Sequence, residues 1–314
     1  MRYRRFDFEK KTPFFRPPKY TGITLSLLSV FVLVSMLAVW EKMANVPKLP
    51  VINVLAWENT RLPLENAGSI YQNETSCLVH ITYLPFSDLS SLPSLNNKTN
   101  QHPWDLILLP ETDAIRPFLL ENKYEQRGIV AYYKGKDDPR GEIFKPKQPI
   151  PLLSLVERAK QEDKEVHSFL RFLKAPTKGQ VEFAINGWTG VNEDHWEVSP
   201  QLKIYAIQSS KPWINHLAEQ FAQNEGLELS VSYLDMRSLQ TSLKILTKAN
   251  NKDYLPDLIG FPANDSKPAW LDPYFSEVHY STDINSGAFS FYIRKQSPLL
   301  KTVQKFLVVL RENQ

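Results

Sequence analysis

Residues 52–60 read INVLAWENT, and residues 202–210 read LKIYAIQSS. Both stretches join a short apolar strand to a polar turn, and the second lies 150 positions after the first. At the same offset, residues 81–84 (ITYL) are matched by residues 231–234 (VSYL). Apolar runs of this kind, rich in Val, Ile and Leu, are typical of parallel strands that are covered on both faces.

A third pair of strands extends the match. Residues 104–110 (WDLILLP) correspond to residues 256–262 (PDLIGFP) after a further shift of two positions. Spacings held over roughly 60 residues predict a duplicated β-α-β-α-β unit, because solenoid repeats are shorter, at about 20–50 residues. We therefore expect an α/β fold with two tandem lobes and mainly parallel sheets, whose ligand sites lie beyond the carboxyl ends of the strands.

The duplication sets the expected domains, with a first lobe over 51–195 and a second over 200–314. The polar stretch before Pro200 marks the boundary. Each copy also carries a later strand pattern, and we match residues 128–133 to residues 287–292.

An uncharged segment, residues 21–40, precedes the lobes. Twenty helical residues at about 1.5 Å each span the roughly 30 Å hydrocarbon core of a bilayer. Residues 1–20 carry seven Lys or Arg and two Asp or Glu, a net charge of +5, which favours a cytoplasmic N-terminus. A cleaved signal peptide is the alternative, but the small residues of an A-x-A cleavage site are missing. We expect a single-pass anchor in a bacterial inner membrane, a spacer over 41–50 and lobes outside the cytoplasm.

The basic tail accounts for the positive charge of the chain. The whole chain carries +3, so residues 21–314 carry about +3 − 5 = −2. This balance gives no reason to expect a nucleic-acid partner. One cysteine, Cys77, cannot form an internal disulfide, so the lobes must be held together by their cores.

The strand-turn-helix patterns resemble those of type 2 extracellular solute-binding proteins, the receptors of ABC importers. Residues 202–234 are similar to the opening of molybdate-type members, and residues 55–59 (LAWEN) to that of polyamine-type members. Residues 169–180 resemble the closing helix pair of the family. A full member has two lobes joined by crossing strands, whereas each copy here has the length of one lobe. The resemblance implies two truncated copies in tandem.

The resemblance places candidate ligand contacts at the strand ends, where hydroxyls and free N–H groups of helix N-termini hold anions. In the second copy these are Ser209, Ser210, Ser238, Asn264 and Ser266. In the first copy they are Asn59, Thr60, Ser87 and Thr112, with Trp57 as an aromatic wall for a cation. Ordinary capping and turn positions, and a core tryptophan, are the alternative interpretation of these residues.

Catalytic motifs are missing from the sequence. It contains no G-x-S-x-G, no H-E-x-x-H and no phosphate-binding glycine loop, and its six histidines have no ligand spacing. We therefore expect a non-enzyme without metal or cofactor. The resemblance to solute-binding proteins implies that it captures a small solute, an oxyanion or carboxylate, for transport or sensing. Its partners would be ABC importer subunits or another envelope protein. The alternative is a degenerate binding-protein fold that acts as a protein-interaction or sensory module without a small ligand.

Overall fold

The computed structural model describes residues 21–44, 49–91, 104–112, 123–135, 148–160, 163–249, 252–263, 265, 267–284 and 287–312. The chain divides into two compact units, residues 1–49 and 50–314, which we describe separately. The first unit contains one described helix, α1 (Thr21–Ala44). Within the described part of the chain, no helix combines the length and apolar character needed to cross a membrane, so the structure does not support the transmembrane prediction.

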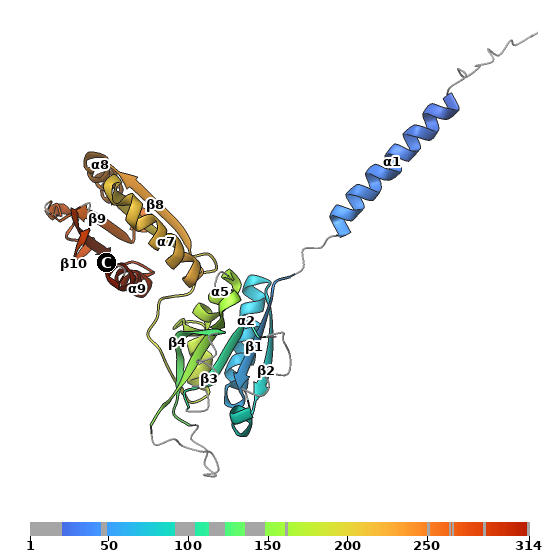
Figure 1. Cartoon of the computed structure of the whole chain (residues 1–314), viewed down its shortest axis with the longest axis horizontal. Helices are drawn as coiled ribbons and strands as arrows, with labels where there is room; N and C mark the ends of the chain where they lie inside the picture. The colour runs from blue at the N-terminus through green and yellow to red at the C-terminus, as the bar shows by residue number, and fades with distance from the viewer. Residues whose placement is uncertain are drawn as a thin grey trace, which may run out of the picture. The chain divides into compact units, whose positions relative to one another are not determined.

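The first copy in the second unit is built on a six-stranded sheet of order β2-β1-β3-β5-β4-β6 (Figure 1). Its strands are β1 (Val51–Trp57), β2 (Leu78–Leu84), β3 (Leu106–Pro110), β4 (Tyr124–Tyr133), β5 (Ile150–Glu157) and β6 (Trp188–Gly190). Its helices are η1 (Glu58–Thr60), α2 (Arg61–Thr75), η2 (Phe86–Ser91), η4 (Arg158–Lys160), α5 (Lys164–Lys174) and α6 (Gly179–Ile185).

The second copy has a five-stranded sheet of order β10-β11-β9-β7-β8. Its strands are β7 (Gln201–Ile207), β8 (Glu228–Leu234), β9 (Leu258–Pro262), β10 (Phe275–Ile284) and β11 (Gly287–Arg294). Its helices are η5 (Gln208–Ser210), α7 (Lys211–Glu225), α8 (Met236–Lys248), η6 (Lys252–Tyr254), η7 (Ala269–Leu271) and α9 (Leu300–Glu312).

The predicted duplication is confirmed in the bounds of the elements. β1, η1, α2 and β2 recur as β7, η5, α7 and β8 at an offset of 150 residues, and β3 recurs as β9 at 152. The strand registers match as well, since Val51 pairs with Leu78 as Gln201 pairs with Glu228. The first three strands of each copy are parallel, as expected for β-α-β units.

The expectation of mainly parallel sheets is wrong for the rest of each copy. The chain turns back after β4 and again after β10, so β5 runs antiparallel to both β3 and β4, and β11 runs antiparallel to both β9 and β10. The strand beside β3 is β5, and the strand beside β9 is β11. The equivalent of residues 287–292 is therefore in β5, not in residues 128–133 as the sequence suggested. The sequence also predicts a helix over residues 114–120, which lie outside the described residues.

Each copy has its own core of apolar side chains. In the first copy the sheet is covered by α2 and α5, through Leu64 and Tyr71 on one helix and Phe169 and Phe172 on the other, all fully buried. In the second copy Phe221 of α7 stacks against Phe306 of α9, with ring centroids 5.1 Å apart. Burial of a large apolar side chain contributes about 1.5–3 kcal/mol, so each copy has a sizeable core.

The two copies end their first long helix in the same way but with different residues. Ser76 follows α2 with φ 58°, and Gly226 follows α7 with φ 62°, both left-handed. A Cβ added to Gly226 would lie 2.8 Å from the Cβ of His167 on α5. The glycine therefore allows α5 of the first copy to approach the end of α7 closely.

Candidate functional site

The predicted hydroxyls of the second copy are engaged in local structure. Ser210 is buried and donates a hydrogen bond to the carbonyl of Ile207 at 2.7 Å, which closes the turn after β7. The Ser238 hydroxyl donates a hydrogen bond at 2.6 Å to the carboxylate of Asp235, the residue that caps the N-terminus of α8. Ser209 is exposed, whereas Asn264 and Ser266 lie outside the described residues. The role of all five in ligand binding stays a prediction.

The first copy repeats this pattern. Thr60 is buried and donates to the Trp57 carbonyl at 2.5 Å, as Ser210 does to Ile207. Asn59 is exposed, and Ser87 donates to Asp88 at 2.8 Å. The Thr112 hydroxyl is buried without a hydrogen-bond partner among the described residues. Thr60 and Ser87 therefore behave as turn or capping residues, as Ser210 and Ser238 do in the second copy.

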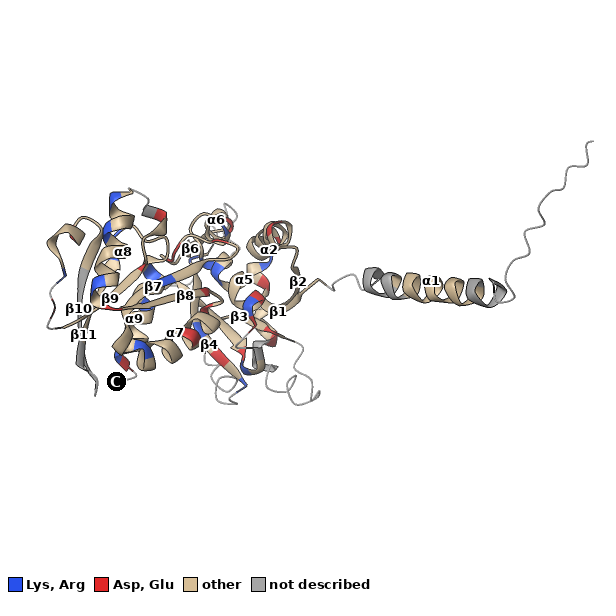
Figure 2. Cartoon of the chain, turned by 90° about the horizontal axis from the view of Figure 1, so that it is seen from above, with Lys and Arg blue, Asp and Glu red and all other residues tan. Residues whose placement is uncertain are grey.

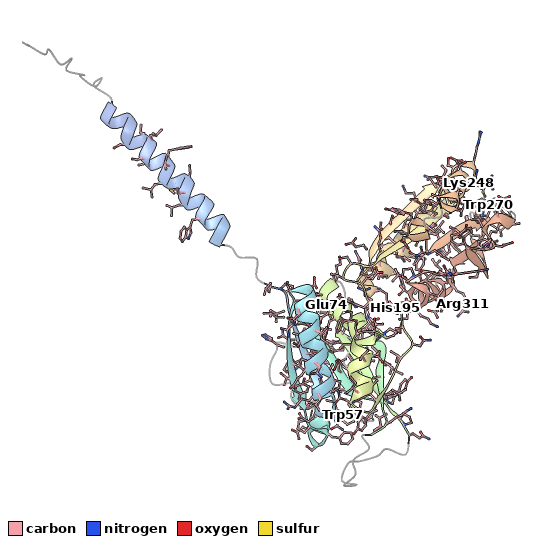
Figure 3. All side chains as sticks on the ribbon, turned by 180° about the vertical axis from the view of Figure 1, so that it is seen from behind. Trp57, Glu74, His195, Lys248, Trp270 and Arg311 are labelled. Carbon is pink, nitrogen blue, oxygen red and sulfur yellow. The ribbon has the colours of Figure 1, made fainter. Side chains whose placement is uncertain are left out.

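The Trp57 side chain lies in the core of the first copy, 3% exposed. Its ring centroid is 5.3 Å from that of Tyr133, 5.9 Å from Trp188 and 6.1 Å from Phe86. Figure 3 shows Trp57 and Glu74 at opposite ends of the first copy. The strand edge predicted to bind a cation is thus filled by aromatic side chains, which pack edge to face.

Hydrogen bonds join the two copies at the C-terminal end of α7, the end opposite Ser209 and Ser210. Arg171 of α5 donates to the Gly226 carbonyl at 3.2 Å, and Lys164 pairs with Glu228 at 3.3 Å. A 15-residue helix is about 22 Å long, so these contacts lie about one helix length from Ser209 and Ser210 at its start. Ser209 and Ser210 therefore do not face the junction.

The segment between the copies, residues 191–200, is attached to both. Its Trp196 packs on Tyr71 and Phe172 of the first copy, with centroids 6.0 and 5.1 Å apart. Its Asp194 accepts hydrogen bonds from the backbone N–H groups of Lys301 and Thr302 at the start of α9. The connection is held on both sides.

A small polar pocket of about 50 Å³ lies at this junction, between α5, α7, α9 and the connecting segment. Four basic side chains line it: Arg127, Arg171, Lys174 and Lys305. Three acidic ones accompany them: Glu193, Asp194 and Glu225. Figure 2 shows acidic and basic residues mixed along α5 and α7. A water site takes roughly 10–15 Å³ by this measure, so there is room for a few waters or one small ion.

Lys174 is the most buried of the four cations, 7% exposed, and donates to the carbonyl of Arg127 at 2.7 Å. Burial, together with the positive charge of Lys305, lowers the pKa of its ammonium to about 8. Burial likewise lowers the pKa of Arg171 to about 10. The pocket therefore holds positive charge that is poorly solvated.

The acidic groups neutralise only part of this charge. Glu193 pairs with Lys305 at 2.9 Å. Burial by itself would lower the pKa of Lys305, but the negative charges of Glu225 and Glu193 have the larger combined effect, so the pKa is raised. The Asp194 carboxylate accepts hydrogen bonds from the first N–H groups of α9. Arg127 pairs with Glu125 at 3.4 Å, whereas Arg171 and Lys174 donate to the backbone carbonyls of Gly226 and Arg127 and form no ion pair among the described residues. The Nε–H groups of both arginines are also buried without a partner among the described residues, which leaves donors in excess.

A larger pocket of about 780 Å³ lies in the second copy, at the amino edge of its sheet. Within the described part of the chain, no group of three or more His, Cys, Asp or Glu side chains is placed to hold a metal ion. Sequence reasoning missed both pockets. The basic residues of the first come from β4, α5 and α9, far apart in the chain, and no motif links them.

Comparison with known proteins gives partial structural similarity only. No family model matches the chain, and no curated protein matches it. A substrate-binding domain assigned to a molybdenum ABC transporter from Clostridium difficile is 12% identical, with a TM-score of 0.33, over 45% of this chain and 99% of that domain.

Two further structures match more of the chain. Iron-bound HitA from Pseudomonas aeruginosa is 11% identical, with a TM-score of 0.23, over 82% of this chain and 79% of HitA. HinK, a LysR family transcriptional regulator from the same organism, is 13% identical, with a TM-score of 0.20, over 93% of this chain and 80% of HinK. Because these TM-scores are below 0.5, we base no inference on them.

Proposed function

We propose that this chain is a non-catalytic binding protein that captures a small oxyanion at the junction of its two copies. The observation that carries the proposal is the pair of cations Arg171, half-buried, and Lys174, buried, which line a small pocket and form no ion pair among the described residues. A buried cation without a counter-charge is costly, so an anion that enters the pocket is stabilised. Charge-assisted hydrogen bonds from guanidinium and ammonium groups suit an oxyanion.

The location agrees with the single-lobe character of each copy. The connection from β4 to β5 is residues 134–149, and that from β10 to β11 is residues 285–286. Neither is long enough to form the second lobe that the resemblance calls for, so the cleft of a two-lobed receptor is not expected within one copy. A site shared by the copies would take its place.

Calorimetry with sulfate tests the proposal, since the charge of sulfate does not change between pH 6 and 10. We expect the full-length chain to bind sulfate at pH 7, and Lys174→Gln to weaken binding at least tenfold, about 1.4 kcal/mol. Lys248→Gln, at the exposed end of α8, is the matched control and should bind as the unmodified chain does.

The pH dependence gives a second test of the same site. Lys174 loses its charge as the pH rises through about 8, so sulfate affinity should fall between pH 7 and 9.5. Absence of sulfate binding at 10 mM, or binding unchanged by Lys174→Gln, would refute the anion site.

Attachment to a membrane and delivery to an importer are part of the proposal. Their support is the uncharged stretch of residues 21–40, the basic residues before it and the resemblance to importer receptors. Fractionation of cells that express the full chain, with alkaline washing of the membranes, tests attachment. Release of the chain by the wash would contradict an integral anchor.

A second candidate function is binding of a protein partner, favoured by exposed apolar residues around the filled edge of the first copy. Phe86, which contacts Trp57, is 56% exposed, Leu62 at the start of α2 is 54% exposed, and Ile185 at the end of α6 is 69% exposed. Clustered exposed apolar side chains often mark interaction sites. Replacing the three by serine should abolish association with a partner while leaving sulfate binding unchanged.

A further inference from the structure

The larger pocket lies on the opposite edge of the second sheet from Ser209 and Ser210. It is lined by Gln201 and Lys203 at the start of β7, by Asp257 just before β9, and by Lys295 after β11. Its volume of about 780 Å³ is within the range of small-molecule sites, about 300–1,000 Å³. It shares no lining residue with the pocket between the copies.

A buried ion pair forms the floor of this pocket. Oδ1 of Asp257 accepts hydrogen bonds from Nη2 of Arg294 and Oγ of Ser297, each at 2.7 Å, and Oδ2 accepts one from the Lys203 backbone N–H at 3.0 Å. The side chains of Asp257 and Arg294 are 3% and 8% exposed. With its carboxylate occupied on both oxygens, the floor is fixed and electrically neutral.

The first copy shows that the fold does not require this ion pair. Asp105, the equivalent of Asp257, accepts the same backbone hydrogen bond, from the N–H of Asn53 at 2.8 Å. The strand registers place Glu157 where the second copy has Arg294. The carboxylate therefore serves the sheet in both copies, whereas the arginine is an addition of the second.

The walls of the pocket carry both positively and negatively charged side chains. Lys203 donates to the Asp253 carbonyl at 3.1 Å, and Lys295 donates to the Asp272 carbonyl at 2.7 Å. Each ammonium has three N–H donors, so each keeps two for other acceptors. The carboxylates of Glu197 and Asp253 are on exposed residues. Two cations and two anions around a neutral floor give a wall without net charge.

We propose that this pocket binds a zwitterionic solute of the amino-acid or short-peptide class. The ligand's carboxylate contacts the ammonium groups of Lys203 and Lys295, and its amino group contacts Asp253 and Glu197. The apolar side chains of Tyr274 and Leu255, which also line the pocket, contact its uncharged part. A purely anionic ligand would leave the two carboxylates of the walls without a partner, and a purely cationic ligand would leave the two ammonium groups without one. This site is separate from the oxyanion site and does not depend on it.

Three peptides with one skeleton test the proposal by calorimetry on the full-length chain: triglycine, N-acetyltriglycine and triglycinamide. The first is a zwitterion, the second an anion and the third a cation. We expect triglycine to bind at least tenfold more tightly than either analogue. Equal binding of all three, or no binding of triglycine at 10 mM, would overturn the proposal.

Two wall variants locate the site. Lys295→Gln and Asp253→Asn should each weaken triglycine binding at least fivefold and leave sulfate binding unchanged, and Lys248→Gln should change neither. Lys295 also donates a hydrogen bond to the Asp272 carbonyl, so thermal melting checks that the Lys295→Gln protein is folded. The Asp253→Asn variant tests the site independently. Triglycine binding that both wall variants leave intact, or that sulfate displaces, would place the peptide elsewhere and refute this site.

Discussion

The carboxylate of Asp194, outside both sheets, caps the helix that contains Thr302. Its Oδ2 accepts hydrogen bonds from both the backbone N–H and the hydroxyl of Thr302, each at 2.7 Å. The first N–H groups of α9 are thus satisfied by a residue more than 100 positions earlier, where the helix dipole also favours a negative charge. The connecting segment, whose Trp196 packs on the first copy, is thereby also tied to the second copy.

Removal of this cap should destabilise the protein. For Asp194→Ala we expect a loss of about 1–2 kcal/mol in the free energy of unfolding, because a capping side chain contributes about that much. Asp194→Asn keeps one acceptor oxygen and should lose less. Urea denaturation measures both, with Asp265→Ala at an exposed position as the control. An Asp194→Ala protein as stable as the control would show that α9 is capped by other means.

The buried ion pair of the second copy should behave as a unit. Asp257→Ala removes the buried carboxylate that pairs with the Arg294 guanidinium, and we expect a loss of about 3–5 kcal/mol in the free energy of unfolding. The double variant Asp257→Asn/Arg294→Met removes both charges and should be more stable than Asp257→Ala. A double-mutant cycle of Asp257→Asn, Arg294→Met and the double variant measures the coupling in urea, because guanidinium chloride would screen the charges. Additive single effects would contradict a coupled pair.

Lys174 should give the stability a distinct pH profile. The pKa of its ammonium is about 8 in the folded protein, below the ordinary lysine value of 10.5, so the unfolded chain binds more protons between these values. Stability therefore rises with pH through this window, because deprotonation relieves the buried charge. The measurement is the difference in unfolding free energy between the unmodified chain and Lys174→Met from pH 7 to 10.5. A difference that stays constant over this range would mean that the ammonium is well solvated.

The two left-handed helix ends form a matched pair of positions. Gly226→Ala should destabilise the protein by about 1–2 kcal/mol from the backbone conformation alone, and the approach to His167 adds to this. Ser76→Gly, at the equivalent place in the first copy, relieves the same strain and should be neutral or stabilising. Thermal unfolding compares them. If Gly226→Ala is tolerated as well as Ser76→Gly, the close packing of α5 on α7 is not rigid.

The sequence by itself determined the duplication and the parallel half of each sheet. Val54 and Ile204, or Asp105 and Asp257, occupy matching places because the same spacing of apolar strands and polar turns gives the same β-α-β unit. Local patterns also indicate the αL glycine after α7. These are short-range features, and a repeated segment encodes them twice.

Only the tertiary structure decided the antiparallel half and the sites. Whether β5 or β4 lies beside β3 depends on where the chain turns back, which strand patterns do not encode. Ser210 and Thr60 have hydroxyl groups of the kind that bind anions, yet in the fold these hydroxyls donate their hydrogen bonds to neighbouring backbone carbonyls. Arg127, Lys174 and Lys305 come from three distant segments, and their charges become coupled only when packing removes the water between them.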